Sequence, residues 1–136
     1  MFHSLFKKFK KFNIYLIIKD VDIFLSIIFY ISNQKQNYKD INDISFSFVQ
    51  YIVDIKNKNA TLLTLKTNIK YRNKGYAKKL LHESLNYLKI NKKIQKIELD
   101  DMSNNSWSDH NIYKLFGFKY INNYPEPEMI LYLINK

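Results

Sequence analysis

Residues 71–79, YRNKGYAKK, join the end of a predicted strand to the start of a helix through a short loop. The segment contains Arg72, which is the sole arginine of the chain, and Gly75, one of its two glycines. Directly after the loop, apolar residues recur at helical spacing and predict an amphipathic helix over Tyr76–Leu88. Such a junction directs unpaired backbone N–H groups at one point, with the positive end of the helix dipole behind them. The segment therefore predicts a binding site for an anion such as a pyrophosphate.

The composition sets the class of protein. A chain of 136 residues can bury one hydrophobic core, so we expect residues 1–136 to form a single domain. Hydrophobic residues make up 46% and aromatic residues 16%, which excludes a disordered or collagen-like chain. Cysteine is absent and the three histidines are scattered, so we expect no disulfide, no thiolate nucleophile and no metal site. The formal net charge of +10 favours an anionic partner.

The N-terminal segment, residues 1–12, combines phenylalanines with lysines. Phe2, Leu5, Phe6 and Phe9 recur at helical spacing, and four lysines take the other side. This pattern predicts a basic amphipathic helix, which could lie on an anionic membrane or an RNA. The alternative, which we favour, is a terminal helix or strand lead-in that packs its phenylalanines on the core. Charged residues then interrupt the apolar pattern before a membrane span or a secretory signal is complete, so we expect an intracellular protein.

The hydrophobic pattern along the chain predicts a mixed α/β fold, in which helices cover one central sheet. Strands are expected at residues 14–19, 46–55, 60–67, 94–100, 118–121 and 129–134. Helices are expected at residues 20–32, 76–88 and 108–116, with a loop or a short second helix at 33–43. The polar residues 57–59 predict a hairpin turn between the second and third strands.

Charge is distributed unevenly along the chain. Between Ile55 and Ile97 there are 12 basic residues and one acid, Glu83. Between Glu98 and Glu128 there are six acids and two lysines. A basic region beside an acidic one suits an anionic cofactor next to a cationic second substrate.

Two motifs contain the two glycines of the chain. The first is Arg72-x-x-Gly75-x-Ala77, preceded by Leu65-x-Thr67-x-Ile69-x-Tyr71, and the second is Tyr113-Lys114-Leu115-Phe116-Gly117-Phe118. They resemble, in the same order, the loop motif R/Q-x-x-G-x-G/A and the motif Y-x-x-x-G-F of the GNAT superfamily, the acyl-CoA-dependent N-acyltransferases. The resemblance covers the chain from Ala60 to its end, and the first 45 residues by element order only.

The resemblance implies a central mixed, mostly antiparallel sheet with splayed middle strands and helices on both faces. Acyl-CoA, in the first place acetyl-CoA, would lie between the strands Leu62–Thr67 and Ile94–Asp100. Backbone groups of Leu65 and Thr67 would pair with the pantetheine arm. The pyrophosphate would be held by the loop and the first helical turn, that is by Arg72, Asn73, Lys74, Gly75, Tyr76, Ala77 and Lys78.

The same resemblance assigns catalytic roles. Tyr113 would donate a proton to the sulfur of the leaving CoA. The general base is open, because the strand before the loop contains no acid. Glu98 and Asp100, which share one face of their strand, are the first candidates. Further candidates are Asp54, Asp101 and His110, and a water chain without a single base is another possibility.

The remaining site residues concern the pantetheine arm and the acceptor. Asn105 adjoins Ser106, which stands where the family often has an asparagine, and we assign Asn105 to a pantetheine contact. Trp107 either lines the acceptor pocket or anchors its loop. The acids of Tyr124–Glu128 either attract a protonated amine or serve as surface charge.

The leading hypothesis is transfer of an acetyl group from acetyl-CoA to a primary amine of a small molecule, a peptide or a protein. A second is a GNAT-fold binding module that has lost turnover. A third is a basic protein that binds RNA or a membrane surface, although the chain has no aromatic stacking motif for single-stranded nucleic acid. Nucleic acid is therefore disfavoured as a partner. The chain is expected to be a monomer or a homodimer.

Overall fold

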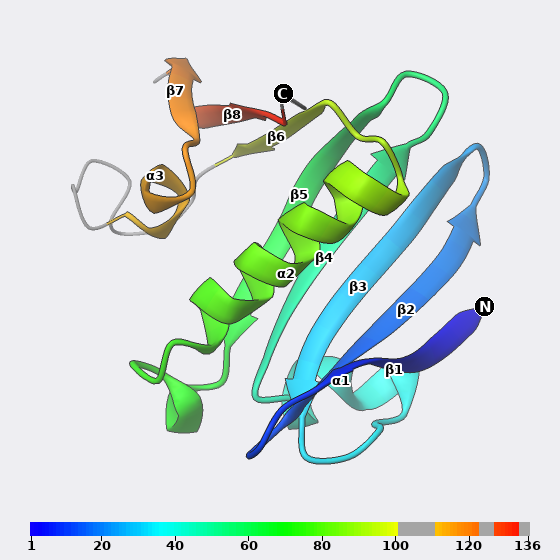
Figure 1. Cartoon of the computed structure of the whole chain (residues 1–136), viewed down its shortest axis with the longest axis vertical. Helices are drawn as coiled ribbons and strands as arrows, with labels where there is room; N and C mark the ends of the chain where they lie inside the picture. The colour runs from blue at the N-terminus through cyan, green and yellow to red at the C-terminus, as the bar shows by residue number, and fades with distance from the viewer. Residues whose placement is uncertain (101–110, 123–126, 134–136) are drawn as a thin grey trace.

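The computed structural model describes residues 1–100, 111–122 and 127–133, and its central feature is an eight-stranded sheet (Figure 1). The strand order is β1-β2-β3-β4-β5-β6-β8-β7, and among the described residues every neighbouring pair is antiparallel except β5 and β6. The strands are β1 (Phe2–Lys8), β2 (Asn13–Val21), β3 (Phe24–Ser32), β4 (Ser47–Asp54), β5 (Asn59–Thr67), β6 (Lys96–Asp100), β7 (Lys119–Asn122) and β8 (Glu128–Tyr132). The helices are η1 (Tyr38–Asp40), α1 (Ile41–Ile44), η2 (Ile69–Tyr71), α2 (Tyr76–Asn91) and α3 (Ile112–Leu115).

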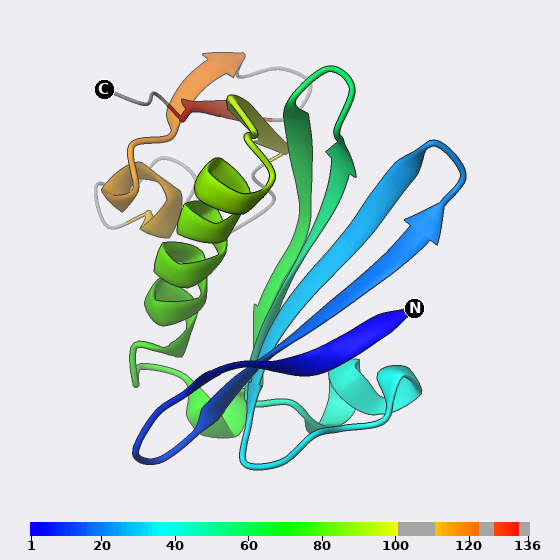
Figure 2. The same cartoon turned by 45° about the vertical axis from the view of Figure 1, so that its right-hand side comes forward.

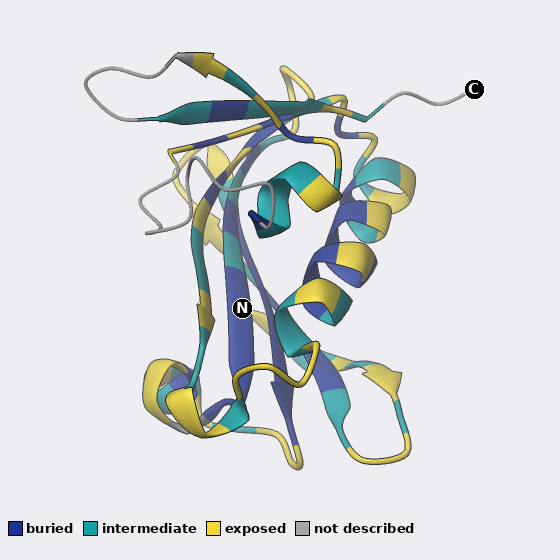
Figure 3. Ribbon diagram, turned by 90° about the vertical axis from the view of Figure 1, so that its left-hand side faces the viewer, coloured by how far each residue is buried: buried dark blue, intermediate teal, exposed yellow. Residues whose placement is uncertain are grey.

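Helices lie on both faces of the sheet (Figure 2). On one face, α2 buries an apolar stripe formed by Leu80, Leu81, Leu85 and Leu88 against the strands, while its exposed residues point outward (Figure 3). On the other face, a smaller core is closed by Ile41 of α1, together with the partly buried Tyr38 of η1. The predicted architecture, a mostly antiparallel sheet with helices on both faces, is confirmed.

The helix predicted at residues 20–32 is wrong, because this segment is the end of β2, a tight turn and β3. Asp22 has a positive φ of 61° at that turn. Side chains of β3 are buried alternately in the two cores: Phe29 packs beneath α2, and Tyr30 packs beneath α1. A strand that is buried on both faces shows a continuous apolar run without alternation, and such a run does not distinguish a strand from a buried helix.

The N-terminal helix predicted in residues 1–12 is also wrong, because residues 2–8 form the edge strand β1, which pairs with β2. The pairing register shifts between Leu5 and Lys7, so the apolar residues of β1 do not follow a strict period of two. Phe6, Phe9 and Phe12 pack on the main core, as the favoured alternative predicts. Phe2 and Leu5 are exposed.

The other elements form where the pattern predicts them, with shifted ends. The strand at 14–19 becomes β2, the hairpin around residues 57–59 joins β4 to β5, and the helix at 76–88 extends to Asn91. The short helix α3 begins at Ile112 instead of Ser108, because Asn111 is extended and caps it: its side-chain oxygen accepts hydrogen bonds from the N–H groups of Tyr113 and Lys114. Ser108 lies outside the described residues.

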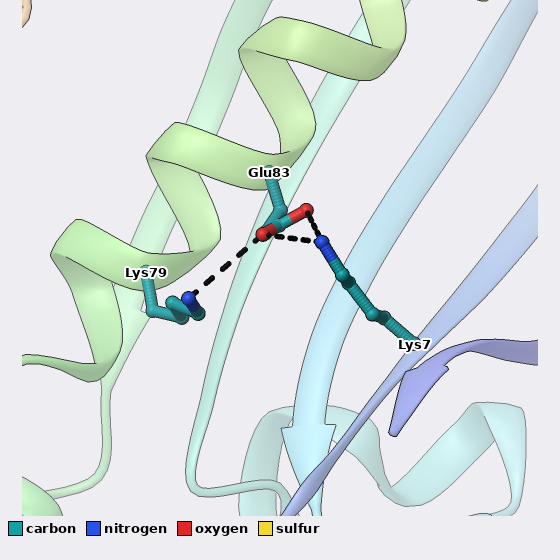
Figure 4. Close-up of polar contacts among 3 residues, drawn as sticks. All are labelled: Lys7, Lys79 and Glu83. Atoms are coloured by element: carbon teal, nitrogen blue, oxygen red, sulfur yellow. Dashed lines mark hydrogen bonds and ion pairs between the residues drawn. The ribbon is translucent and has the colours of Figure 1, made fainter. Parts of the chain in front are cut away.

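A buried carboxylate ties the N-terminal strand to the central helix. Glu83 of α2 is 7% exposed, and its two carboxylate oxygens lie 3.1 and 3.2 Å from Nζ of Lys7 on β1 (Figure 4). Nζ of Lys79, one helical turn before Glu83, lies 3.9 Å from the same carboxylate. Lys79 also lies over the ring of Phe9, with its Nζ 4.5 Å from the ring centroid. The hairpin β1–β2 is thereby fixed to the first turns of α2.

Replacement of Lys7 by methionine should lower the free energy of unfolding by about 1–2 kcal/mol, because the Glu83 carboxylate loses its nearest donor in a buried position. Urea unfolding followed by circular dichroism measures the loss. The exposed neighbour Lys8 provides the matched control, and Lys8→Met should change stability by less than about 0.5 kcal/mol. Equal effects of the two substitutions would contradict a role of the Lys7–Glu83 pair.

Candidate functional site

The two middle strands of the sheet diverge. The strands β5 and β6 pair in parallel from Asn59 to Thr61, and the rest of β5 is paired with β4 alone among the described residues. On its β4 side, the ladder shifts register between Gln50 and Tyr51, which leaves Leu63 as the extra residue of β5. The predicted splay is confirmed. Among residues 1–100, 111–122 and 127–133, it leaves the second half of β5 with a free backbone edge that can pair with an extended ligand.

A cavity of about 660 Å³ lies beside this free edge. Its walls are the end of β5, the loop after it, the first turn of α2 and the helix α3. The lining residues are Leu65, Lys66, Thr67, Tyr71, Arg72, Asn73, Gly75, Tyr76, Ala77, Lys78, Ile112 and Tyr113. Residues that are up to 48 positions apart in the sequence (from Leu65 to Tyr113) thus face one volume.

The loop before α2 turns through left-handed backbone conformations. Asn73 has a φ of 63°, and Gly75, the N-cap of α2, has a φ of 81°. A Cβ atom placed on Gly75 would meet nothing within 4 Å, so glycine is needed here for its φ and the space in front of it is open. The first hydrogen bond of the helix runs from the N–H of Lys79 to the carbonyl of Gly75. The N–H groups of residues 76–78 come before it in the chain and have no acceptor within the helix. They are available to an anion at the cavity wall.

Arg72 links this loop to the preceding strand. Its Nε donates to the carbonyl oxygen of Thr67 at 3.2 Å, and the hydroxyl groups of Thr67 and Ser47 lie 2.9 Å apart. The arginine is otherwise exposed, and the guanidinium has further N–H donors beyond Nε. Arg72 therefore shapes the loop and keeps donors for a ligand.

Aromatic rings pack the loop against the main core. Tyr71 stacks on Phe46 with ring centroids 4.0 Å apart, and Tyr76 lies against the same ring at 5.8 Å. Phe12, from the N-terminal hairpin, meets Tyr76 edge-on at 5.3 Å. These contacts hold both ends of the loop on the main core, so that its backbone donors are pre-positioned.

The electrostatics of the cavity favour a negative ligand. Lys66, Arg72 and Lys78 line it, and no carboxylate does so among the described residues. The first turn of α2 contains no acid that would compete for the N–H groups. The helix dipole adds to the positive field at this point.

Tyr113 occupies the opposite wall, on α3. Its ring packs edge-on against Phe118 at 5.8 Å, and Asn111 caps the helix that carries it. Burial raises the pKa of Tyr51, its hydrogen bond with Ser84 lowers it to a lesser extent, and the nearby Tyr113 makes a smaller contribution that raises it. Tyr51 is therefore a neutral phenol, and its hydroxyl lies 2.7 Å from Oγ of Ser84 on α2.

The candidate bases do not line the cavity. Glu98 lies in the paired part of the sheet opposite Thr61, and its Oε1 is 3.2 Å from Nζ of Lys96. Asp100 is opposite Glu128 of β8, and it shares a face with Glu98, since Ile97 and Leu99 point into the core.

Asp54 serves the hairpin turn between β4 and β5. Hydrogen bonds from the side-chain amide and the backbone N–H of Asn57 hold the pKa of Asp54 below its usual value. The carboxylate is therefore ionised, and both of its oxygens accept hydrogen bonds from Asn57 within the turn. Asp101, Asn105, Trp107 and His110, with the first part of the Tyr124–Glu128 loop, lie outside the described residues.

The structure thus brings most of the predicted cofactor residues to one cavity. Lys74 is exposed and does not line it. Three lining residues were missed by the sequence analysis: Lys66, Tyr71 and Ile112. Each adjoins a predicted residue in the sequence, so the motifs contained a signal for the wall as a whole.

Comparison with known proteins gives a fold. No family model and no curated sequence matches the chain. Among solved structures, the chain is similar to the PaiA N-acetyltransferase from Thermoplasma acidophilum in complex with coenzyme A, with a TM-score of 0.60 and 19% identity over 79% of this chain and 60% of that one. The chain has the GNAT fold. Because the match covers 60% of the PaiA N-acetyltransferase, this chain spans less than two thirds of the length of that protein.

Two further GNAT-fold structures agree. The ribosomal-protein-alanine N-acetyltransferase of Escherichia coli gives a TM-score of 0.61 at 20% identity, over 86% of this chain and 74% of that one. A GNAT-family acetyltransferase from Staphylococcus aureus gives 0.59 at 18% identity, over 80% and 68%. In the described part of this chain, no group of three His, Asp or Glu residues could hold a metal ion, and no helix is long and apolar enough to cross a membrane.

Gly75→Ala should lower the free energy of unfolding by about 1 kcal/mol, because a Cβ disfavours a φ of 81° even in open space. Gly75→Asn should cost less, since asparagine tolerates left-handed backbone better than other residues. Gly117→Ala should cost more than Gly75→Ala, because φ is 96° there and the added Cβ would lie 3.3 Å from Leu131. Urea unfolding of the three variants gives the order, and equal losses for alanine and asparagine at position 75 would contradict the conformational explanation.

Proposed function

We propose that this chain transfers an acetyl group from acetyl-CoA to a primary amine. The observation that carries the proposal is the single cavity that joins the free edge of β5, the open first turn of α2 and Tyr113. An extended thioester arm needs the first feature, a pyrophosphate needs the second, and a leaving thiolate needs a proton donor such as the third. The GNAT fold, which N-acetyltransferases share, supports this reading.

Each part of the cavity has a role in binding acetyl-CoA. The N–H groups of residues 76–78 would bind the pyrophosphate, with Arg72 and Lys78 supplying charge. The backbone of Leu65 and Thr67 would pair with the pantetheine amides along the free edge of β5. With the pyrophosphate at α2, the thioester would extend toward Tyr113.

The acceptor amine, in its neutral form, attacks the carbonyl carbon of the thioester. The carbon–sulfur bond breaks, and the Tyr113 phenol donates its proton to the leaving thiolate. The amine nitrogen gives up one proton as the amide forms. Because no carboxylate among the described residues lines the cavity, this proton would leave through water, or through Glu98 or Asp100. These two acids lie on the face of β6 opposite the main core. The acceptor is a small molecule, a peptide or a protein.

The lack of a carboxylate among the described residues that line the cavity favours a second candidate, a module that binds acyl-CoA without turnover. Tightly positioned backbone donors and cations suffice for binding, whereas transfer also needs a route for the amine proton. The two candidates share the binding site and differ in activity alone.

Arg72→Ala should weaken acetyl-CoA binding about 10-fold or more, because charge-assisted hydrogen bonds and the shape of the loop are both lost. Isothermal calorimetry with the purified chain measures the dissociation constant. Lys70, two residues away, is exposed and does not line the cavity, so Lys70→Ala should change it less than about 2-fold and serves as the control for net charge. No saturable binding at millimolar acetyl-CoA by the folded wild-type chain would overturn the proposal, and RNA binding that weakens steeply with salt would then replace it.

Tyr113→Phe should lower kcat about 100-fold or more, with little change in acetyl-CoA affinity, because phenylalanine keeps the ring contact with Phe118 and loses the proton donor. Release of free CoA thiol with a panel of primary amines measures turnover. A wild-type chain that binds acetyl-CoA and acetylates no amine would favour the binding module. Unchanged kcat in Tyr113→Phe would remove the acid role from Tyr113.

A further inference from the structure

Three turns lie together at the end of the sheet that is remote from the loop before α2 (Figure 1 and Figure 2). They are the β2–β3 turn, the β4–β5 turn and the turn between α2 and β6, which comprise residues 21–24, 55–58 and 92–95. Because Leu25 of β3 pairs with Val53 of β4, the first two turns are neighbours. The N–H of Gln95 donates to the carbonyl of Lys58 at 2.8 Å and joins the second turn to the third. We call the exposed residues of these three turns the turn surface.

The turn surface presents large apolar side chains to solvent. Ile23 is 79% exposed at the tip of the β2–β3 hairpin, and Val21 and Phe24 beside it are also exposed. Ile55 is exposed in the neighbouring turn. Single exposed apolar residues are ordinary, but several in adjoining turns are typical of an interaction site.

The turn surface is also basic. Residues 55–58 and 89–93 together contain five lysines and no acid. The acids nearest in sequence are Asp20, Asp22 and Asp54. Asp22 has a φ of 61°, a backbone conformation that aspartate tolerates better than most residues, and Asp54 accepts hydrogen bonds from Asn57. Two of the three acids therefore have a structural reason to be there, and the lysines leave the surface positive.

Lysines beside exposed isoleucines match the chemistry of an anionic membrane surface. Apolar side chains can enter the boundary between headgroups and acyl chains, while lysines attract the anionic headgroups. A nucleic acid would use the lysines and leave Ile23 and Ile55 in water, so a bilayer fits the surface better. The sequence suggested residues 1–12 as a membrane contact, but Phe6, Phe9 and Phe12 pack on the main core.

We propose that the turn surface docks this chain on an anionic lipid bilayer. Ile23 and Ile55 enter the headgroup region, and Lys56, Lys58 and Lys93, which are exposed, lie at the lipid phosphates and carboxylates. The inference is independent of the proposed function. The helix α2 has 16 residues and is about 24 Å long, and the cavity lies at its other end, so docking leaves the cavity accessible.

The first test is co-sedimentation of the purified chain with vesicles. The chain should bind phosphatidylcholine vesicles that contain about 30% phosphatidylserine at least 10-fold more tightly than vesicles of phosphatidylcholine alone. Ile23→Asn should weaken this binding about 5-fold or more, and the double variant Lys56→Gln/Lys93→Asn about 10-fold or more. Asparagine suits position 93, where φ is 57°. Circular dichroism confirms that each variant is folded.

Matched controls remove the same side chains from the opposite end of α2. Ile69, which is 75% exposed, and the exposed Lys70 and Lys74 lie there. Ile69→Asn and Lys70→Gln/Lys74→Gln should each change vesicle binding less than about 2-fold. Equal losses for the two lysine pairs would mean that net charge alone drives binding, and would overturn the proposal.

A second test reports insertion directly. The chain contains no cysteine, so Ile23→Cys accepts a single environment-sensitive fluorophore. Its emission should shift to the blue on anionic vesicles, whereas the same label on Ile69→Cys should not respond. An unshifted label at position 23, or no retention on anionic vesicles, would overturn the proposal. Binding of poly(U) RNA that Lys56→Gln/Lys93→Asn weakens, with vesicle binding unaffected by Ile23→Asn, would also overturn it and assign the surface to nucleic acid.

Discussion

The parallel pairing of β5 and β6, which stops after Thr61, is the constraint on which the site depends. Two parallel strands need a crossover, and α2 supplies it, so α2 must begin near the end of β5. Because β6 has already left β5 at that level, the free edge of β5 and the first turn of α2 border the same gap. The backbone topology therefore places unpaired strand groups and unpaired helix N–H groups side by side. The main chain thus defines the site, and side chains add positive charge, from Arg72 and Lys78, and the phenol of Tyr113.

The loop between β5 and α2 keeps its shape through contacts from distant parts of the chain. Arg72 bonds to the strand that precedes the loop, and Tyr71 and Tyr76 pack on Phe46. Phe12 extends this support to the N-terminal hairpin, which the Lys7–Glu83 pair fastens to α2. An anion site made of backbone donors works best when the donors need no rearrangement on binding. The first strands of the chain, which do not line the cavity, thus contribute to the candidate site by rigidity.

The sequence predicts the loop and α2 well, because an isolated glycine and arginine precede a clear amphipathic pattern. It mispredicts β3, since Phe29 and Tyr30 are buried in different cores and no polar side remains to reveal a period of two. It mispredicts β1, where a register shift around Phe6 gives apolar residues a spacing that resembles a helix. A second cavity, which adjoins the first, could not be predicted from the sequence, for another reason. Its wall combines Asn42 and Asp43 with Lys66, and only the tertiary fold brings α1 to the end of β5.

The central claim is that acetyl-CoA binds between the free edge of β5 and the first turn of α2. The most direct test is an NMR titration of the 15N-labelled chain with acetyl-CoA, in which each backbone amide reports its own environment. We predict saturable shifts for the amides of Leu65, Thr67 and residues 75–78, which persist at 0.3 M salt, while amides of the β2–β3 turn stay unchanged. Shifts that are spread over the lysine-rich surface and vanish with added salt, or no shifts at millimolar ligand, would contradict the claim.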